Sequence, residues 1–220
     1  RNFTGPQSVV LQAGEILMAE VSKELIEEAI KGYIEPHLEK DLVTTKCVKA
    51  VDIDGDKVSV TLELGFPVTG YMDQLVAAVR ERVEAVDGVS SAQVAASWKV
   101  VAHSVQKSLK PIDNVKNIIA VASGKGGVGK STTAVNLALA LAAEGARVGV
   151  LDADIYGPSQ PRMLGISGQP ESTDGKTLEP MTNYGIQAMS IGFLVDEETP
   201  MIWRGPMVTQ ALEQLLNDTN

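Results

Sequence analysis

The sequence predicts an α/β domain with a parallel sheet, preceded by a smaller α+β domain. Residues 19–102 alternate between helical and strand-like hydrophobic periods in the order α-β-β-α-β. Residues 116–220 begin instead with an apolar strand, a glycine-rich loop, an apolar helix and a second apolar strand, the pattern of a parallel βαβ unit. Between them, 103–115 are polar and contain a proline, which indicates a linker. Residues 1–18 have no clear period, and we expect a flexible lead.

The first helix and a hairpin open the smaller domain. Apolar residues recur every four positions from Val21 to Tyr33 while charges fill the other face, which predicts an amphipathic helix that Pro36 ends. Two β-prone runs, CVKAVDI and KVSVTLEL, flank Asp54-Gly55. This dipeptide is a strong signal for a tight hairpin turn.

A second helix and a third strand complete the smaller domain. Apolar residues at helical spacing from Leu75 to Val86 predict the helix, and Gly88 is placed to end it. The run VSSAQVAASW at 89–98 predicts the strand.

The second domain is expected to contain further strands and helices. NIIAVAS at 117–123 predicts a buried strand, TTAVNLALALAAEG at 132–145 a helix, and ARVGVLDAD at 146–154 a second buried strand. A loop rich in Gly, Pro and Ser, a strand and a helix follow at 155–180, 186–193 and 206–218.

The composition argues against several classes of function. The 19 basic and 28 acidic residues give a net charge of −9, which disfavours broad binding to nucleic acids or anionic membranes. No apolar run reaches the roughly 18 residues of a membrane span. The only cysteine, Cys47, excludes an intramolecular disulfide and fits a reducing, cytoplasmic setting. We therefore expect no nucleic-acid partner and no membrane.

The stretch SGKGGVGKST predicts a phosphate-binding loop. It fits G-x-x-x-x-G-K-[ST] and lies between a predicted strand and a predicted helix, as that motif requires. Lys130 is expected to bridge the β- and γ-phosphates of a nucleotide, and the Ser131 hydroxyl to bind Mg²⁺. The alternative is a glycine-rich turn before a helix. The expected nucleotide-binding residues are Gly124, Lys125, Gly126, Gly127, Val128, Gly129, Lys130, Ser131 and Thr132.

The loop contains a second lysine, Lys125. GKGGVGKST resembles the deviant Walker A motif of the ATPases that include the nitrogenase iron protein and the MinD/ParA partition proteins. The resemblance implies a homodimer in which Lys125 reaches the nucleotide of the partner subunit and acts in catalysis, as an arginine finger does. The alternative is a lysine that only faces solvent.

Two aspartates follow the strand 146–154. Asp152 and Asp154 alternate at its carboxyl end, the side on which such sheets bind ligands. The resemblance implies that Asp152 lies near Mg²⁺ and its waters, and that the catalytic Asp154 orients or deprotonates the attacking water. The alternative is that each aspartate only caps a loop.

Further stretches, DADIYGPS and WRGPM, resemble the Mrp/ApbC family of iron–sulfur cluster carrier ATPases. The resemblance implies an ATP-hydrolysing homodimer that receives a labile cluster from scaffold proteins and passes it to apo iron–sulfur proteins. It also implies a small iron–sulfur-assembly domain in front. Two alternatives remain: a MinD/ParA-like positioning ATPase, and an inactive, truncated interaction module.

Three family features are not found in the sequence. It contains neither D-x-P-P-G-T-G-D nor Cys-x-x-Cys, and the loop at 65–70 has no cysteine. We therefore expect an incomplete P-loop NTPase domain, a fragment with slow or undetectable ATP hydrolysis by itself. For Cys47 we expect a structural, buried thiol, with a cluster shared by two copies of Cys47 as the alternative.

Overall fold

The computed structural model describes residues 21–103, 112–195 and 205–220. The chain divides into two compact units. The front unit comprises the residues up to Glu63 together with Asp73–Ser97, and the second comprises Leu64–Met72 with Trp98 onward. The expected lead and most of the expected linker lie outside the described residues. The predicted domain limits therefore stay a prediction.

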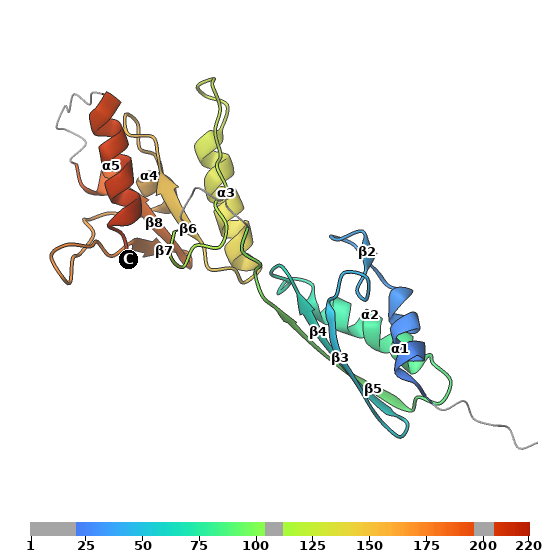
Figure 1. Ribbon diagram of the computed structural model, residues 1–220. Coiled ribbons are helices and arrows are strands. Elements are labelled where there is room, and N and C mark those ends of the chain that lie inside the picture. Colours follow the sequence, from blue (N-terminus) through green and yellow to red (C-terminus); the bar gives the residue numbers. More distant parts are fainter. Residues whose placement is uncertain (1–20, 104–111, 196–204) are drawn as a thin grey trace, which may run out of the picture. The chain divides into compact units, whose positions relative to one another are not determined.

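The front unit has the predicted order α-β-β-α-β, and Figure 1 shows both helices against one face of its sheet. A short antiparallel pair, β1 with β2, is inserted after the first helix and was not predicted. The sheet has the order β3-β4-β5, and β3 pairs with β4 antiparallel. The elements are α1 (Lys23–Lys31), β1 (Ile34–Glu35), β2 (Lys40–Asp41), β3 (Val48–Asp54), β4 (Lys57–Leu64), α2 (Met72–Glu84) and β5 (Ser91–Trp98).

The end of α1 differs from the prediction. The helix stops at Lys31, where the N–H of Gly32 donates to the carbonyl of Ala29 at 3.2 Å and the N–H of Tyr33 donates to that of Ile30 at 2.9 Å. Pro36 lies beyond this end and does not set it. The buried residues of α1 are Ile26 and Ile30, and α1 lies against β3; alternate residues of β4 are buried as well. The buried residues of α1, β4 and α2 are Ile26, Ile30, Val58, Val60, Leu62, Leu64, Leu75, Val79 and Val83.

Cys47 is buried, as predicted, with 5% of its surface exposed. It follows a turn that the Asp41 carboxylate holds by accepting the N–H groups of Thr44 at 2.7 Å and Val43 at 3.0 Å. These hydrogen bonds hold the pKa of Asp41 below its ordinary value, and the bond from Thr44 has the largest effect. The Thr45 hydroxyl lies 3.4 Å from the Cys47 sulfur. The thiol is therefore part of the packed turn before β3.

The second unit contains a mixed sheet rather than the purely parallel one predicted. Its order is β6-β8-β7, with β6 parallel to β8 and β7 antiparallel to β8. The antiparallel pair arises because Tyr184 and Gly185 take positive φ values of 52° and 76° and form a two-residue turn. The elements are α3 (Lys130–Ala143), β6 (Gly149–Asp152), α4 (Gln160–Leu164), β7 (Met181–Asn183), β8 (Ile186–Ser190), a 3₁₀ turn (Ile191–Phe193) and α5 (Gly205–Asn217).

The strand predicted at 117–123 is wrong. This stretch is irregular, and Ile118 and Ile119 are 71% and 60% exposed. An extended apolar run becomes a strand only when neighbouring backbone pairs with it. No strand among the described residues pairs with 117–123, so its apolar sequence stays exposed.

The predicted helices at 132–145 and 206–218 and the predicted strand at 186–193 correspond to α3, α5 and β8. Their apolar residues contribute to one core. No described helix is long and apolar enough to cross a bilayer. The buried residues of this core are Val135, Ala138, Ile155, Leu164, Ile186, Ala188, Met189, Ile191, Phe193 and Leu215.

Candidate functional site

The glycine-rich loop ends directly at the first residue of α3. Gly127 and Gly129 have φ values of 73° and 88°, a backbone conformation that glycine adopts without a steric cost. A Cβ built at either glycine would meet no atom within 4 Å. Glycine is therefore required at these positions for the backbone conformation rather than for space.

The start of α3 is open toward an anion. Gly129 occupies the N-cap position and has no side chain to accept the first N–H groups, and the first turn carries no acidic residue. The first intrahelical bond runs from Thr133 N–H to the Gly129 carbonyl at 2.8 Å. The preceding N–H groups and the positive end of the helix dipole thus remain available to a phosphate. The loop fits a nucleotide phosphate on these grounds.

The two lysines of the loop differ in exposure. Lys130 and Ser131, in the first turn of α3, are partly buried. Lys125 is exposed, and its backbone N–H donates to the Ser123 hydroxyl at 3.2 Å. Thr132 is exposed, and its carbonyl accepts from the Asn136 side chain at 2.8 Å. Lys125 is thus the exposed lysine of the loop, and Lys130, in the first turn of α3, is the partly buried one.

Asp152 is the last residue of β6, and only 6% of its surface is exposed. One carboxylate oxygen, Oδ1, accepts the N–H of Asp154 at 3.1 Å. The other, Oδ2, accepts the N–H groups of Ser159 at 2.9 Å and Gln160 at 3.0 Å, and the Ser190 hydroxyl at 3.4 Å. Asp152 therefore fixes the start of α4 and ties the ends of β6 and β8 together.

A side-chain amide links this carboxylate to the phosphate loop. The Gln160 Nε2 donates to the carbonyl of Ser131 at 3.3 Å, while its backbone N–H binds Asp152. The structure thus brings Asp152 and Ser131 together through Gln160, which the sequence prediction had not singled out. Its only sequence signal is a polar residue within an otherwise loop-like Gly-, Pro- and Ser-rich run.

Asp154 contacts Asp152 through its backbone N–H only, and its side chain takes no part in the hydrogen bonds around Asp152. Its carboxylate is exposed, and its Oδ1 accepts the N–H of Gly157 at 3.1 Å within its own loop. The structure therefore separates the two predicted aspartates into a buried anchor at 152 and an exposed carboxylate at 154.

An alanine at Gly129 is expected to weaken both the fold and phosphate binding. The φ of 88° places any L side chain in a left-handed conformation, at a cost of about 1–2 kcal/mol in unfolding free energy. Thermal unfolding of Gly129→Ala checks this, with Gly124→Ala as the control, because Gly124 is not among the positive-φ glycines. Equal losses in both variants would contradict the backbone argument.

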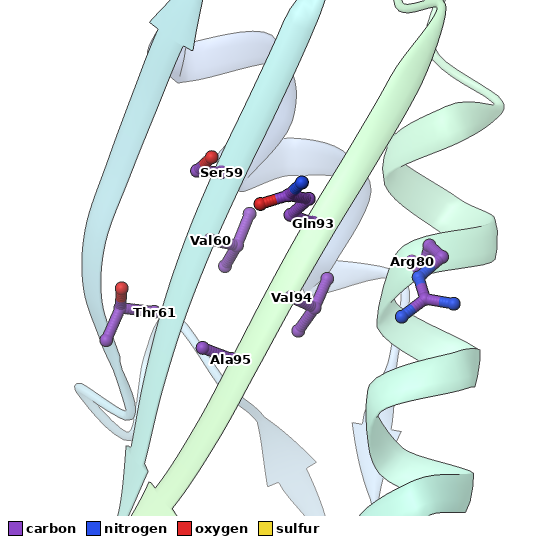
Figure 2. Close-up of a pocket in the computed structure, with 7 residues that line it drawn as sticks. All are labelled: Ser59, Val60, Thr61, Arg80, Gln93, Val94 and Ala95. Carbon is purple, nitrogen blue, oxygen red and sulfur yellow. The ribbon is translucent and has the colours of Figure 1, made fainter.

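A hollow lies in the front unit, over β4, β5 and α2, with a volume of about 340 Å³ (Figure 2). Arg80 is the only charged side chain in its lining, and no residue of the phosphate loop takes part. No group of three or more His, Cys, Asp or Glu side chains in the described ranges is placed to hold a metal ion. The hollow is lined by Ser59, Val60, Thr61, Arg80, Gln93, Val94 and Ala95.

Two family models match the chain. Residues 114–220 match that of the NUBPL iron-transfer P-loop NTPases, and residues 23–96 match that of iron–sulfur cluster assembly proteins. The chain is 44% identical over 195 residues to an iron–sulfur cluster carrier protein of Haemophilus influenzae, covering 88% of this chain and 53% of that protein.

Further relatives match mainly part of the chain. A carrier protein of Pseudomonas fragi is 58% identical over 60% of this chain and 47% of that protein. The iron–sulfur cluster transfer protein NUBPL of Mus musculus is 57% identical over 50% of this chain and 35% of that protein. The chain spans about half the length of the bacterial relatives it matches.

One solved structure is also similar in sequence. It is a nucleotide-binding protein of Archaeoglobus fulgidus in complex with ADP, 38% identical, with a TM-score of 0.37. The match covers 45% of this chain and 37% of that one.

Proposed function

We propose that the chain functions as an ATP-dependent iron–sulfur cluster carrier, because it is similar to the iron–sulfur cluster carrier proteins in both of its matched regions. The observation that carries the proposal is the open start of α3, where uncapped N–H groups follow a glycine-rich loop with two lysines. This arrangement suits the phosphates of a nucleotide. The relatives' names supply the cluster as cargo.

Within this proposal the loop residues 124–132 bind the phosphates of ATP. Lys130 neutralises charge on the β- and γ-phosphates, and the Ser131 hydroxyl is a ligand of Mg²⁺. When bound, Mg²⁺ supplies charge neutralisation on the phosphate oxygens. The backbone N–H groups at the start of α3 orient the phosphates, because they have no acceptor within the helix.

The aspartates take different parts in the proposal. Asp152 already accepts four hydrogen bonds, so we assign it to the water shell of Mg²⁺ and to holding α4, rather than to direct contact with the ion. Asp154 is exposed and accepts one hydrogen bond, which leaves acceptor sites for an attacking water. We propose that Asp154 orients that water for hydrolysis.

Lys125 acts, in the proposal, on the nucleotide of a second copy. It is exposed on the outside of the loop, as a residue that reaches across a homodimer must be.

The partners proposed for the dimer are cluster scaffold proteins and apo iron–sulfur proteins. The proposed setting is the cytoplasm, which suits a free cysteine.

The proposal assigns no cluster ligand to the described residues. Cys47 is buried, and no metal-binding group of three or more His, Cys, Asp or Glu side chains occurs in the described part of the chain. The iron–sulfur cluster is cargo in this proposal, and the described residues serve the nucleotide.

Titration calorimetry with Mg-ATP tests the nucleotide step. We expect one molecule of ATP bound per chain, with affinity lost when ATP is replaced by adenosine, because the loop contacts phosphates only. Anaerobic incubation with iron and sulfide, followed by transfer to an apo-ferredoxin, tests the carrier step. Well-folded protein that gives no heat with Mg-ATP would overturn the nucleotide assignment.

A further inference from the structure

Gln160 is a buried polar residue between two halves of the proposed nucleotide site. It is only 4% exposed, at the first position of α4, which packs against α3. Its backbone N–H donates to Asp152, and its side-chain Nε2 donates to the Ser131 carbonyl at 3.3 Å. Among the described residues, Gln160 is therefore the one whose hydrogen bonds join Asp152 to the phosphate loop.

Packing does not account for an amide at this position. The Gln160 Oε1 is buried with no hydrogen-bond partner among the described residues, and so is the hydroxyl of the neighbouring Ser159. A buried acceptor without a partner costs free energy, and an apolar side chain of similar size would avoid that cost. The donor half of the amide is used, on Ser131, whereas the acceptor half is not. The feature that glutamine adds over leucine is thus the contact with the loop.

The backbone of Ser131 is where that contact acts. The Ser131 carbonyl belongs to the first turn of α3, whose N–H groups face the proposed phosphates. The Ser131 hydroxyl is the proposed Mg²⁺ ligand. A hydrogen bond to the carbonyl limits how this turn shifts relative to Asp152, which is itself fixed by four donors.

We propose that Gln160 is a positioning residue for the magnesium–nucleotide complex: its amide holds Ser131 in register with Asp152. The inference rests on the proposed nucleotide binding and deepens it. Gln160 does not touch the nucleotide. It sets the relative place of the loop hydroxyl and the buried carboxylate, the two groups assigned to the metal and its water shell.

The test compares Gln160→Leu with the wild type by calorimetry of ADP binding, once with Mg²⁺ and once with EDTA. Leucine keeps a similar volume and removes both the donor and the unpartnered oxygen. We expect an unfolding temperature no lower than that of the wild type. We expect affinity for Mg-ADP to fall about 3- to 10-fold, the effect of one lost hydrogen bond, while affinity in EDTA is unchanged.

Two further variants keep the outcome interpretable. Met163→Leu, on the same short helix and partly exposed, is expected to change neither affinity. Gln160→Asn retains an amide that is one methylene too short to reach Ser131, and is expected to lose Mg-ADP affinity as leucine does. It provides the measurement if the leucine variant does not fold.

The outcomes separate the inference from the function on which it rests. Wild-type protein that binds no nucleotide overturns both. Wild-type binding together with an unchanged ratio of Mg-ADP to Mg-free affinity in the Gln160 variants overturns this inference alone. A loss of thermal stability without any change in that ratio would show a structural role only.

Discussion

Replacing Asp152 by asparagine is expected to lower the unfolding free energy of the second unit by about 2–4 kcal/mol. The buried carboxylate accepts from three backbone N–H groups and one hydroxyl. In asparagine an NH₂ group, which only donates, replaces one of the two carboxylate oxygens. That group then faces at least one backbone N–H. That N–H then loses its acceptor at a buried or partly buried position, which costs free energy.

Chemical denaturation of Asp152→Asn, followed by circular dichroism, measures this loss. Asp154→Asn is the matched control, because Asp154 is exposed and its side chain accepts the N–H of Gly157, a hydrogen bond that asparagine also makes in turns. We expect the control to change the unfolding free energy by less than about 0.5 kcal/mol. Similar losses in the two variants would show that Asp152 is not the anchor described above.

Replacing Lys130 by alanine is expected to weaken Mg-ATP binding by about 10- to 150-fold, equivalent to about 1.5–3 kcal/mol. Lys130 is the first residue of α3 and partly buried, so its ammonium is close to the phosphates that the N–H groups of this turn are proposed to bind. Loss of a hydrogen bond between charged groups accounts for this magnitude. Titration calorimetry at fixed ionic strength measures it.

Lys125→Ala provides the control within the same loop. Lys125 is exposed and, in the proposal, serves the nucleotide of a second copy. Under dilute conditions we expect its removal to change the affinity less than about 3-fold, the screened effect of an exposed charge. If the two variants lose equal affinity, the distinct parts proposed for the two lysines are wrong.

Local signals predicted most of the front unit. Asp54-Gly55 indicated a hairpin, and the structure pairs Asp54 with Lys57 around a turn in which Gly55 has a φ of 61°. Such a turn depends on adjacent residues only. The strand predicted at 117–123 was wrong because a strand depends on distant backbone, which the apolar run itself does not specify.

The turn between β7 and β8 shows a weaker local signal. Gly185 fits a two-residue turn, but Tyr184 at a φ of 52° does not belong to the residues that favour it. The strand β7 is also only three residues long, too short for a period of two to stand out. The sequence therefore predicted β8 without its antiparallel neighbour.

In the candidate site, too, the sequence predicts what depends on adjacent residues and misses what depends on residues distant in the chain. The phosphate loop follows a contiguous motif, so the sequence alone predicts its residues, and that assignment stays a prediction. The contacts of Asp152 were not predicted, because three of its donors lie 7, 8 and 38 residues further along the chain. Gln160 was missed for the same reason, since its partner Ser131 is 29 residues earlier.

The hydrogen bonds that hold the start of α4 determine which residues can occupy positions 159 to 161. Two of the donors that Asp152 gathers at the start of α4 are main-chain amides, so the identity of the side chain at 159 is irrelevant to the bond that residue makes. Imino acids are the exception, since they have no amide hydrogen. The proline that occurs here stands at 161, one position past the last amide that the carboxylate needs.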